Sequence, residues 1–228
     1  MVDQSRREAR QDKDFWEIGL ILMNTESTFR AVAIASIALC LPIGLYFRIR
    51  SQATRERLDR RKEGIFIMAG LRLCGLVGWI LLTAYLISPG WVNWSSIALP
   101  VWLRWASAPL ALLVVPVLLF WTFHSLGKNL TDTVVTRRAH TLVTHGPYRW
   151  VRHPFYVVLF LWVLSFTLLT ANWLLALVGA AALTMLVVRT RIEEAKLIER
   201  FGDEYRAYAR RTGRFFPLLG RRRQGQSH

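Results

Sequence analysis

The sequence predicts an all-α polytopic membrane protein with about five transmembrane helices. Of the 228 residues, 53% are hydrophobic, and they gather in long runs rather than recurring at helical or strand spacing. The ten Trp and twelve Phe residues agree with this class, because amphipathic aromatic side chains favour the membrane interface. The basic residues lie between and after the runs, where the positive-inside rule places them in a membrane protein.

Three apolar runs in the first half of the chain predict the first three spans. They cover residues 29–47, 64–87 and 97–126, and each is long enough to cross a hydrocarbon core of about 30 Å. Residues 1–28 are polar apart from a short apolar patch at 15–23. We expect that patch to lie in the interface as an amphipathic helix, because it is too short to span.

Two shorter apolar runs follow, at residues 153–170 and 173–188. Only Ala171 and Asn172 separate them. We therefore expect a tight helical hairpin that passes into the bilayer and returns to the same surface. The arginine-rich tail, residues 189–228, is predicted to be helical and cytoplasmic.

The charge pattern also predicts an orientation. Residues 48–63, 127–152 and 189–228 are basic and should share the cytoplasmic side, whereas the uncharged segment 88–96 should lie on the other side. Arg outnumbers Lys by 26 to 4, which is typical of a GC-rich bacterium. We expect an integral protein of the bacterial inner membrane.

The net charge of +15 raises the alternative of a nucleic-acid partner. We exclude that partner, because the charges lie in the segments that flank the apolar runs and suit an anionic lipid surface. The two cysteines, Cys40 and Cys74, lie inside apolar runs and form no CxxC pair. They are interpreted as small buried hydrophobic residues without a disulfide. The oligomeric state is not predicted.

The candidate site consists of two polar clusters, which the hairpin should bring to one membrane surface. The first cluster occupies residues 140–156 and the second residues 189–194. On a helix, Arg189 and Glu193 share a face, while Glu194 is turned by roughly 100°. The second cluster could equally be a salt-bridge collar beside the membrane. Because both clusters lie late in the chain, we divide it into residues 1–125, with the first three spans, and 126–228, with the polar loop, hairpin and tail.

Three histidines in or near the first cluster raise the possibility of a metal site. His140, His145 and His153 follow no common ligand spacing, and no thiol lies near them in the sequence. No metal is predicted.

Several short motifs lie in the second half of the chain, over about residues 126–217. They are Leu126-Gly-Lys-Asn129, His140-Thr-Leu-Val143, Gly146-Pro-Tyr148, Arg152-His-Pro-Phe-Tyr156, Arg189-Thr-Arg-Ile-Glu-Glu194, Phe201-Gly-Asp-Glu-Tyr205, Tyr208 and Pro217. Together they resemble the isoprenylcysteine carboxyl methyltransferase family and its phospholipid methyltransferase relatives. Each piece alone is a weak signal, but the combination is specific.

The resemblance implies an S-adenosylmethionine-dependent methyltransferase that acts on a lipid-like substrate at the membrane. It implies that Arg189 orients a substrate carboxylate. Such a carboxylate is ionised at neutral pH and needs no general base, whereas an amine substrate would need Glu194 or His153 as a base. The cofactor contacts that it implies are His140, Leu142, Val143, Tyr148, His153 and Glu193.

Three alternatives to a carboxylate O-methyltransferase stay open. One is N-methylation of a phospholipid or another amine. Another is an NADPH-dependent sterol-type reductase, which would share the Gly-Pro-Tyr and Arg-His-Pro segments. A third is a basic membrane scaffold without enzymatic activity.

Overall fold

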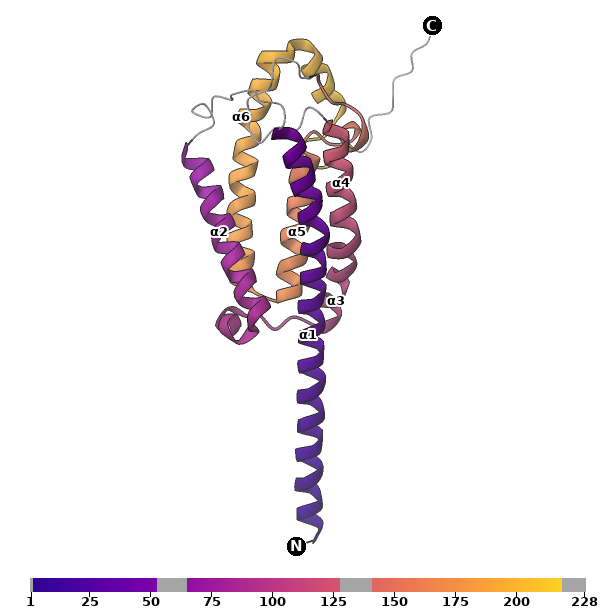
Figure 1. Ribbon diagram of the computed structural model, residues 1–228, viewed down its shortest axis with the longest axis vertical. Coiled ribbons are helices and arrows are strands. Elements are labelled where there is room, and N and C mark those ends of the chain that lie inside the picture. The colour runs from indigo at the N-terminus through magenta and orange to yellow at the C-terminus, as the bar shows by residue number, and fades with distance from the viewer. Residues whose placement is uncertain (1, 53–64, 128–140, 219–228) are drawn as a thin grey trace.

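The computed structural model is a bundle of helices from which the first helix projects at one end (Figure 1). The structure describes residues 2–52, 65–127 and 141–218, and no strand occurs in these ranges. The α-helices in the described ranges are α1 (Val2–Gln52), α2 (Ile65–Ile87), α3 (Val101–Pro109), α4 (Val115–Leu126), α5 (Pro154–Thr170) and α6 (Trp173–Arg211).

The prediction of an all-α polytopic membrane protein is confirmed. Among the residues that the structure describes, four helical stretches are long and apolar enough to cross a membrane, and they cover Thr25–Arg50, Phe66–Ile87, Val101–Leu126 and Trp173–Arg211. The fifth, α5, has 17 residues and packs against α3, α4 and α6 inside the bundle. It is the shorter arm of the predicted hairpin.

The beginning of the chain differs from the expected interfacial helix, because α1 runs without a break from Val2 to Gln52. Residues 2–24 contain many Arg, Glu, Gln and Leu residues, which are good helix formers, and no proline. Pro42 lies inside the membrane-spanning part and does not end the helix. A proline is tolerated in such a helix when neighbouring groups satisfy the carbonyl that it leaves free.

The third span contains a turn of π-helix, Leu110–Val114, between α3 and α4. Pro116 follows this turn and has no N–H to bond the carbonyl four residues back, so a wider turn is accommodated there. Ser36 on α1 donates its hydroxyl to the Ala111 carbonyl at 2.8 Å. This bond ties α1 to the irregular turn.

The hairpin between α5 and α6 turns over two residues, as predicted. Ala171 adopts a left-handed conformation with φ 48°, and the Asn172 side chain caps α6 by accepting the Leu175 N–H at 2.9 Å. Asn172 also donates to Ser95 Oγ at 2.6 Å, in the short helix η2 (Pro89–Ser95). The outer segment therefore holds the turn in place.

A glycine lets the two arms of the hairpin approach closely. A Cβ added to Gly179 would lie 2.3 Å from Val163 Cγ1, which is shorter than any real contact. The close packing fixes the register of α6 against α5. Consequently the polar end of α6 lies at the level of the residues that precede α5.

Near its end, α6 bends at Gly202, where φ is 53° and ψ is −123°, and its last turns lie across one end of the bundle (Figure 1). Only glycine adopts this backbone conformation readily. The bend directs Tyr205 and Tyr208 into the bundle, where both side chains are buried.

The opposite end of the bundle carries a partly buried ion pair. Arg104 Nη1 lies 2.9 Å from Glu26 Oε2, and Arg104 Nε donates to the Leu169 carbonyl at 3.0 Å. Tyr85 donates its hydroxyl to Glu26 Oε1 at 2.6 Å. This cluster connects α1, α2, α3 and α5.

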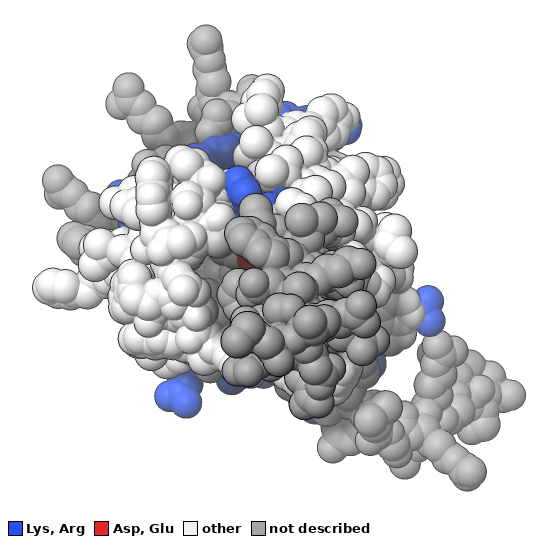
Figure 2. All heavy atoms as spheres, turned by 90° about the horizontal axis from the view of Figure 1, so that it is seen from below, with Lys and Arg blue, Asp and Glu red and all other residues white. Residues whose placement is uncertain are grey.

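The outer face at that end is mostly uncharged where its side chains are described (Figure 2). Large tryptophans are exposed in η2 and at the beginnings of α3 and α6, where a membrane interface would accommodate their rings. They are Trp91, Trp94, Trp102 and Trp173.

Candidate functional site

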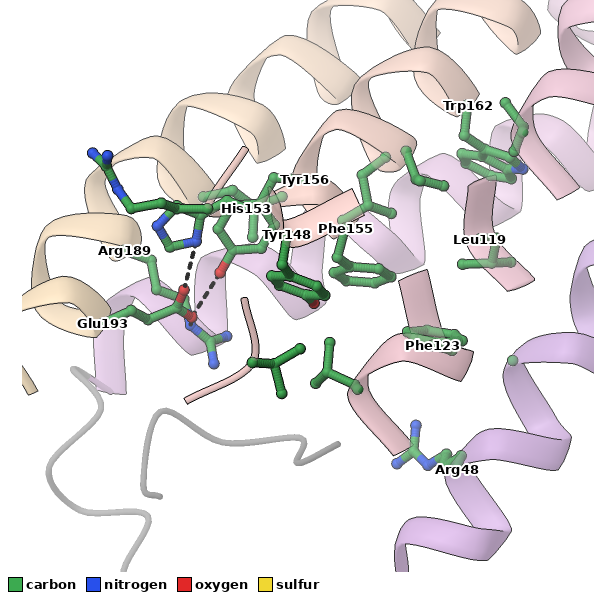
Figure 3. Close-up of a pocket in the computed structure, with 18 of the residues that line it drawn as sticks. Arg48, Leu119, Phe123, Tyr148, His153, Phe155, Tyr156, Trp162, Arg189 and Glu193 are labelled. Atoms are coloured by element: carbon green, nitrogen blue, oxygen red, sulfur yellow. Dashed lines mark hydrogen bonds and ion pairs between the residues drawn. The ribbon is translucent and has the colours of Figure 1, made fainter. Parts of the chain in front are cut away.

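A cavity of about 870 Å³ lies between α1, α4, α5 and α6 at the end of the bundle that α6 covers (Figure 3). Its two halves differ in chemistry. One half is lined by charged and hydroxyl-bearing side chains from the segment before α5 and from α6, and the other by aliphatic and aromatic side chains. Helices from both parts of the chain, before and after residue 126, line this one cavity.

Glu193 is the carboxylate of the polar half (Figure 3). Tyr156 donates its hydroxyl to Glu193 Oε1 at 2.7 Å, and Arg189 Nε lies 3.0 Å from the same oxygen. His153 Nδ1 lies 3.6 Å from Glu193 Oε2. Helical spacing places Arg189 and Glu193 on one face, so a cation and an anion enter the cavity side by side.

His153 lies between two carboxylates, directly before α5. Its Nε2 is 3.3 Å from Glu194 Oε1, on the side of the ring away from Glu193. The imidazole is only 8% exposed and stacks on the Tyr156 ring with an interplanar angle of 7°. Its backbone N–H donates to the Arg214 carbonyl at 3.1 Å. Packing and hydrogen bonds therefore hold the ring in one orientation.

Glu194 is buried beside the cavity and is not among the residues that line it. Arg152 Nε donates to its Oε1 at 2.9 Å, and Arg214 binds both of its oxygens, with Nε at 3.1 Å from Oε1. The hydrogen bond to Glu194 raises the pKa of Arg214. A carboxylate held by two guanidinium groups has the geometry of a structural ion pair.

Arg152 also connects this ion pair to the end of α6. Its Nη1 donates to the Ala209 carbonyl at 2.9 Å and to the Thr212 carbonyl. The last turns of α6 and the residues after them are thus tied to the segment that precedes α5.

Tyr148 closes the polar half from the loop side. Its ring lines the cavity, and its carbonyl accepts a hydrogen bond from Tyr208 Oη at 2.7 Å. Burial, reinforced by Tyr208 and Glu193, raises the pKa of Tyr148 well above its usual range. The hydroxyl therefore stays neutral, as suits a group that binds through hydrogen bonds and ring contacts.

The short helix η5 (Gly146–Arg149) carries Tyr148 and depends on its first residue. Gly146 has φ 60°, and a Cβ there would lie 2.2 Å from Ser125 Oγ on α4. Any other residue would clash with α4 and strain the backbone. Gly146 thus lets the loop lie directly against the bundle.

The structure brings together most of the residues that the sequence singled out. Leu142, Val143, Tyr148, His153, Arg189 and Glu193 all line the cavity. Glu194 lies behind them, and His140 lies outside the described residues. In the described ranges, no group of three or more His, Cys, Asp or Glu residues could hold a metal ion.

Tyr156 and Tyr208 belong to the motifs, but sequence reasoning assigned neither a role in the site, and it did not single out Arg214. Tyr156 belongs to the Arg-His-Pro-x-Tyr motif and follows His153 by three residues, so helical spacing was a signal that could have found it. Arg214 follows Glu194 by 20 residues, across the Gly202 bend, and carries no local signal of that pairing.

The apolar half leads from these groups into the bundle. Phe123 and Leu119 on α4 face Phe155 and Trp162 on α5 across it (Figure 3). On the α1 side the cavity is lined by Leu41 and Leu45, which are 59% and 54% exposed. These two residues line the cavity and are also exposed on the apolar outer surface. The cavity therefore opens toward lipid on this side.

The fold and the cavity define a polytopic membrane protein that joins a polar, arginine-containing pocket to an apolar space within the bundle. Residues 108–199 match the sequence model of the isoprenylcysteine carboxyl methyltransferase (ICMT) family. The resemblance that the motifs indicated is thereby confirmed over the region that forms α4, the polar loop, α5 and most of α6.

Curated relatives match parts of this chain that are 96 to 116 residues long. The protein-S-isoprenylcysteine O-methyltransferase of Schizosaccharomyces pombe is 35% identical over 96 residues, which cover 41% of this chain and 41% of that protein. The enzyme of the same name from Homo sapiens is 34% identical over 96 residues, or 41% and 34% of the two chains. The nickel-cobalt-cadmium resistance protein NccN of Alcaligenes xylosoxydans xylosoxydans is 36% identical over 116 residues, or 50% and 53%.

The matched region spans less than half of the two methyltransferases and about half of NccN. Among solved structures, the eukaryotic intramembrane Ras methyltransferase ICMT is similar, with a TM-score of 0.46 and 19% identity. That comparison covers 81% of this chain and 68% of the other.

Proposed function

We propose that this protein is a membrane methyltransferase that transfers the methyl group of S-adenosylmethionine to a carboxylate oxygen of a lipid-like substrate. One observation carries the proposal: Arg189 and Glu193 lie side by side where the polar and apolar halves of a single cavity meet (Figure 3). A cofactor, an anionic head group and a hydrocarbon tail can be bound together only in such a place. The names of the relatives agree with this chemistry.

The polar half suits the cofactor. S-adenosylmethionine supplies an electrophilic methyl group on a sulfonium, and it carries an amine, a ribose diol, a carboxylate and an adenine. The Glu193 carboxylate can accept hydrogen bonds from an amine or a diol, since among the described residues its close polar neighbours are Tyr156, Arg189 and His153. Leu142, Val143 and Tyr148 provide apolar surface for the adenine ring, and we propose His140 as a further cofactor contact.

Arg189 is the residue that we assign to the substrate. A guanidinium binds a carboxylate through two parallel N–H groups, which would fix the direction of the attacking oxygen. Methyl transfer is an in-line displacement, so positioning and exclusion of water supply most of the rate enhancement. Only the guanidinium Nε faces Glu193, while Nη1 contacts the Met68 sulfur at 3.2 Å. A weak sulfur partner is readily exchanged for an anion.

The position of Glu194 favours oxygen over nitrogen as the acceptor. N-methylation of an amine needs a base that reaches the substrate. Glu194, the candidate for that role, does not line the cavity and already accepts hydrogen bonds from Arg152 and Arg214. We therefore assign Glu194 to the support of the site, and the base that an amine would require is left to His153 alone.

Titration with S-adenosylhomocysteine and, separately, with NADPH tests the proposal and its alternatives. Purified protein in detergent is followed by calorimetry, and membranes that contain it are supplied with S-adenosylmethionine carrying a labelled methyl group. We expect binding of S-adenosylhomocysteine and labelled methyl esters among the extracted lipids and acids. Binding of NADPH instead would indicate the reductase, and binding of neither would indicate the scaffold.

We further propose that the cavity end of the bundle faces the cytoplasm of a bacterial inner membrane. The support is the basic character of residues 48–63, 127–152 and 189–228 and the absence of charge from segment 88–96 at the opposite end. A reporter enzyme fused after the tail, active only in the cytoplasm, should be active, and an inactive fusion would reverse the orientation.

A further inference from the structure

We propose that Trp162, braced by Trp79 and Phe166, is the end wall of the apolar half and sets the longest hydrocarbon tail that the substrate can carry. The inference rests on the proposed function in one respect, since it takes the occupant to be the tail of the methyl acceptor. It adds a specificity-determining residue and a testable property of the substrate.

The apolar half is a shaft whose walls are helix faces. On α5, Phe155, Val158, Leu159 and Trp162 line it with the i, i+3, i+4, i+7 spacing of one face. At 1.5 Å per residue, Trp162 lies about 10 Å further along the axis than Phe155. The α4 wall, from Leu126 to Val115, is about 16 Å long. A tail whose head group is held at Arg189 therefore points along α5 toward Trp162.

The shaft ends where the side chains of the bundle are closely packed. Trp162 packs against the buried cluster of Ala33, Leu82 and Phe166, each of which is at most 2% exposed. The Trp162 and Phe166 rings lie 4.5 Å apart between centroids. Among the described residues, none on α5 beyond Trp162 lines the cavity, and none on α1 before Ile37 does. The packed side chains leave no continuation for a longer tail.

Trp79 contributes the outer, lipid-facing edge of the wall from α2, where its side chain is 46% exposed. Its ring centroid lies 6.3 Å from that of Trp162, and it is the residue of α2 that lines the cavity within the part of the chain that the structure describes. The pair bridges α2 and α5 below the side on which Leu41 and Leu45 open toward lipid. A tail that enters from the bilayer between α1 and α2 therefore meets the two indoles at its far end.

The position of the wall can be measured by binding alone, without catalysis, from the alkyl chain length at which affinity stops rising. The probes are cysteine thioether acids that carry straight alkyl chains of increasing length, added to the full-length protein in detergent. Each CH₂ that enters an apolar site contributes about 0.8 kcal/mol, which corresponds to about a fourfold tighter Kd per carbon. For the wild type we expect that rise to stop at one chain length.

Substitution of the tryptophans that form the wall should shift the chain length at which affinity stops rising. We expect Trp162→Leu to prolong the fourfold rise to longer chains, and Trp79→Leu to do so to a smaller extent. Trp173→Leu is the matched control, because Trp173 is exposed near the hairpin turn and lies outside the cavity. Should Trp162→Leu fail to fold, Trp162→Phe removes less volume, and together with Trp79→Leu it still tests the limit.

Two results would overturn the inference. An unchanged limit in both wall variants would show that Trp162 and Trp79 do not bound the tail. A wild type whose affinity rises with every chain tested would show that the tail leaves sideways into the bilayer. Methyl transfer to the same acids is scored separately, so a length limit without methylation refutes the proposed function and leaves the wall intact.

Discussion

Replacement of Glu194 by Gln tests whether this carboxylate stabilises the fold around the site or contacts the bound cofactor. The substitution keeps the shape of the side chain and removes the charge that faces Arg152 and Arg214. The side chains of Glu194 and Arg152 are each 12% exposed, so the guanidinium that remains would be poorly solvated. Breaking a buried ion pair in this way costs about 3–5 kcal/mol.

The lower end of that range applies here, because Gln retains one acceptor oxygen and Arg214 is 38% exposed and partly screened by solvent. We expect a loss of about 3 kcal/mol. For a chain of this size that corresponds to a decrease in Tm of about 6–12 °C. Thermal unfolding of the ligand-free protein in detergent measures it. The control is Asp203→Asn, since Asp203 pairs with Arg206 on the surface and its side chain is 94% exposed.

Well below its Tm, the Glu194→Gln protein should also retain most of its affinity for S-adenosylhomocysteine. Glu193→Gln and His153→Ala should instead lose affinity while remaining folded. A Glu194→Gln protein as stable as Asp203→Asn but unable to bind S-adenosylhomocysteine would refute the assignment, and would place Glu194 against the cofactor.

Three further predictions concern the substrate and the backbone. Arg189→Ala should reduce kcat for methyl transfer far more than it weakens S-adenosylhomocysteine binding, and equal losses measured by kinetics and calorimetry would count against a substrate role. Gly179→Ala should destabilise the protein by about 1–3 kcal/mol in thermal unfolding, because its Cβ would overlap Val163; Val163→Ala in the same chain should restore most of the loss. Gly202→Ala should cost about 1–3 kcal/mol through backbone strain alone, since no atom lies within 4 Å of the added Cβ. Gly75→Ala, also without neighbours within 4 Å, should leave Tm unchanged or raise it.

The hairpin and the location of the site followed from local properties of the sequence. Only Ala171 and Asn172 separate the two apolar runs, which leaves room only for a tight turn, and that turn returns α6 to the surface where Arg152 and His153 lie. Helical geometry likewise separated Glu193 from Glu194 by about 100°. In the structure this rotation directs Glu193 into the cavity and Glu194 toward Arg214.

The features that sequence reasoning did not predict depend on tertiary contacts. The pairing of Arg214 with Glu194 requires the chain to bend at Gly202 and return. The π-helical turn is tied to α1 by Ser36, which lies 75 residues before the carbonyl that it binds. The end wall depends on a contact between Trp79 and Trp162, which no periodicity relates.

The ion pair of Glu26 and Arg104 has a consequence for how the chain is assembled in the bilayer. Arg104 lies in the first turn of the third span, where its side chain is 13% exposed, and a guanidinium buried without its partner is destabilising. Its partners come from the first span and from the last turn of α5, whose Leu169 carbonyl it binds. The third span is therefore fully accommodated only after the first is in place and the hairpin has been inserted. A chain that begins after Glu26 should leave this arginine without its carboxylate and be degraded by the quality-control proteases of the membrane.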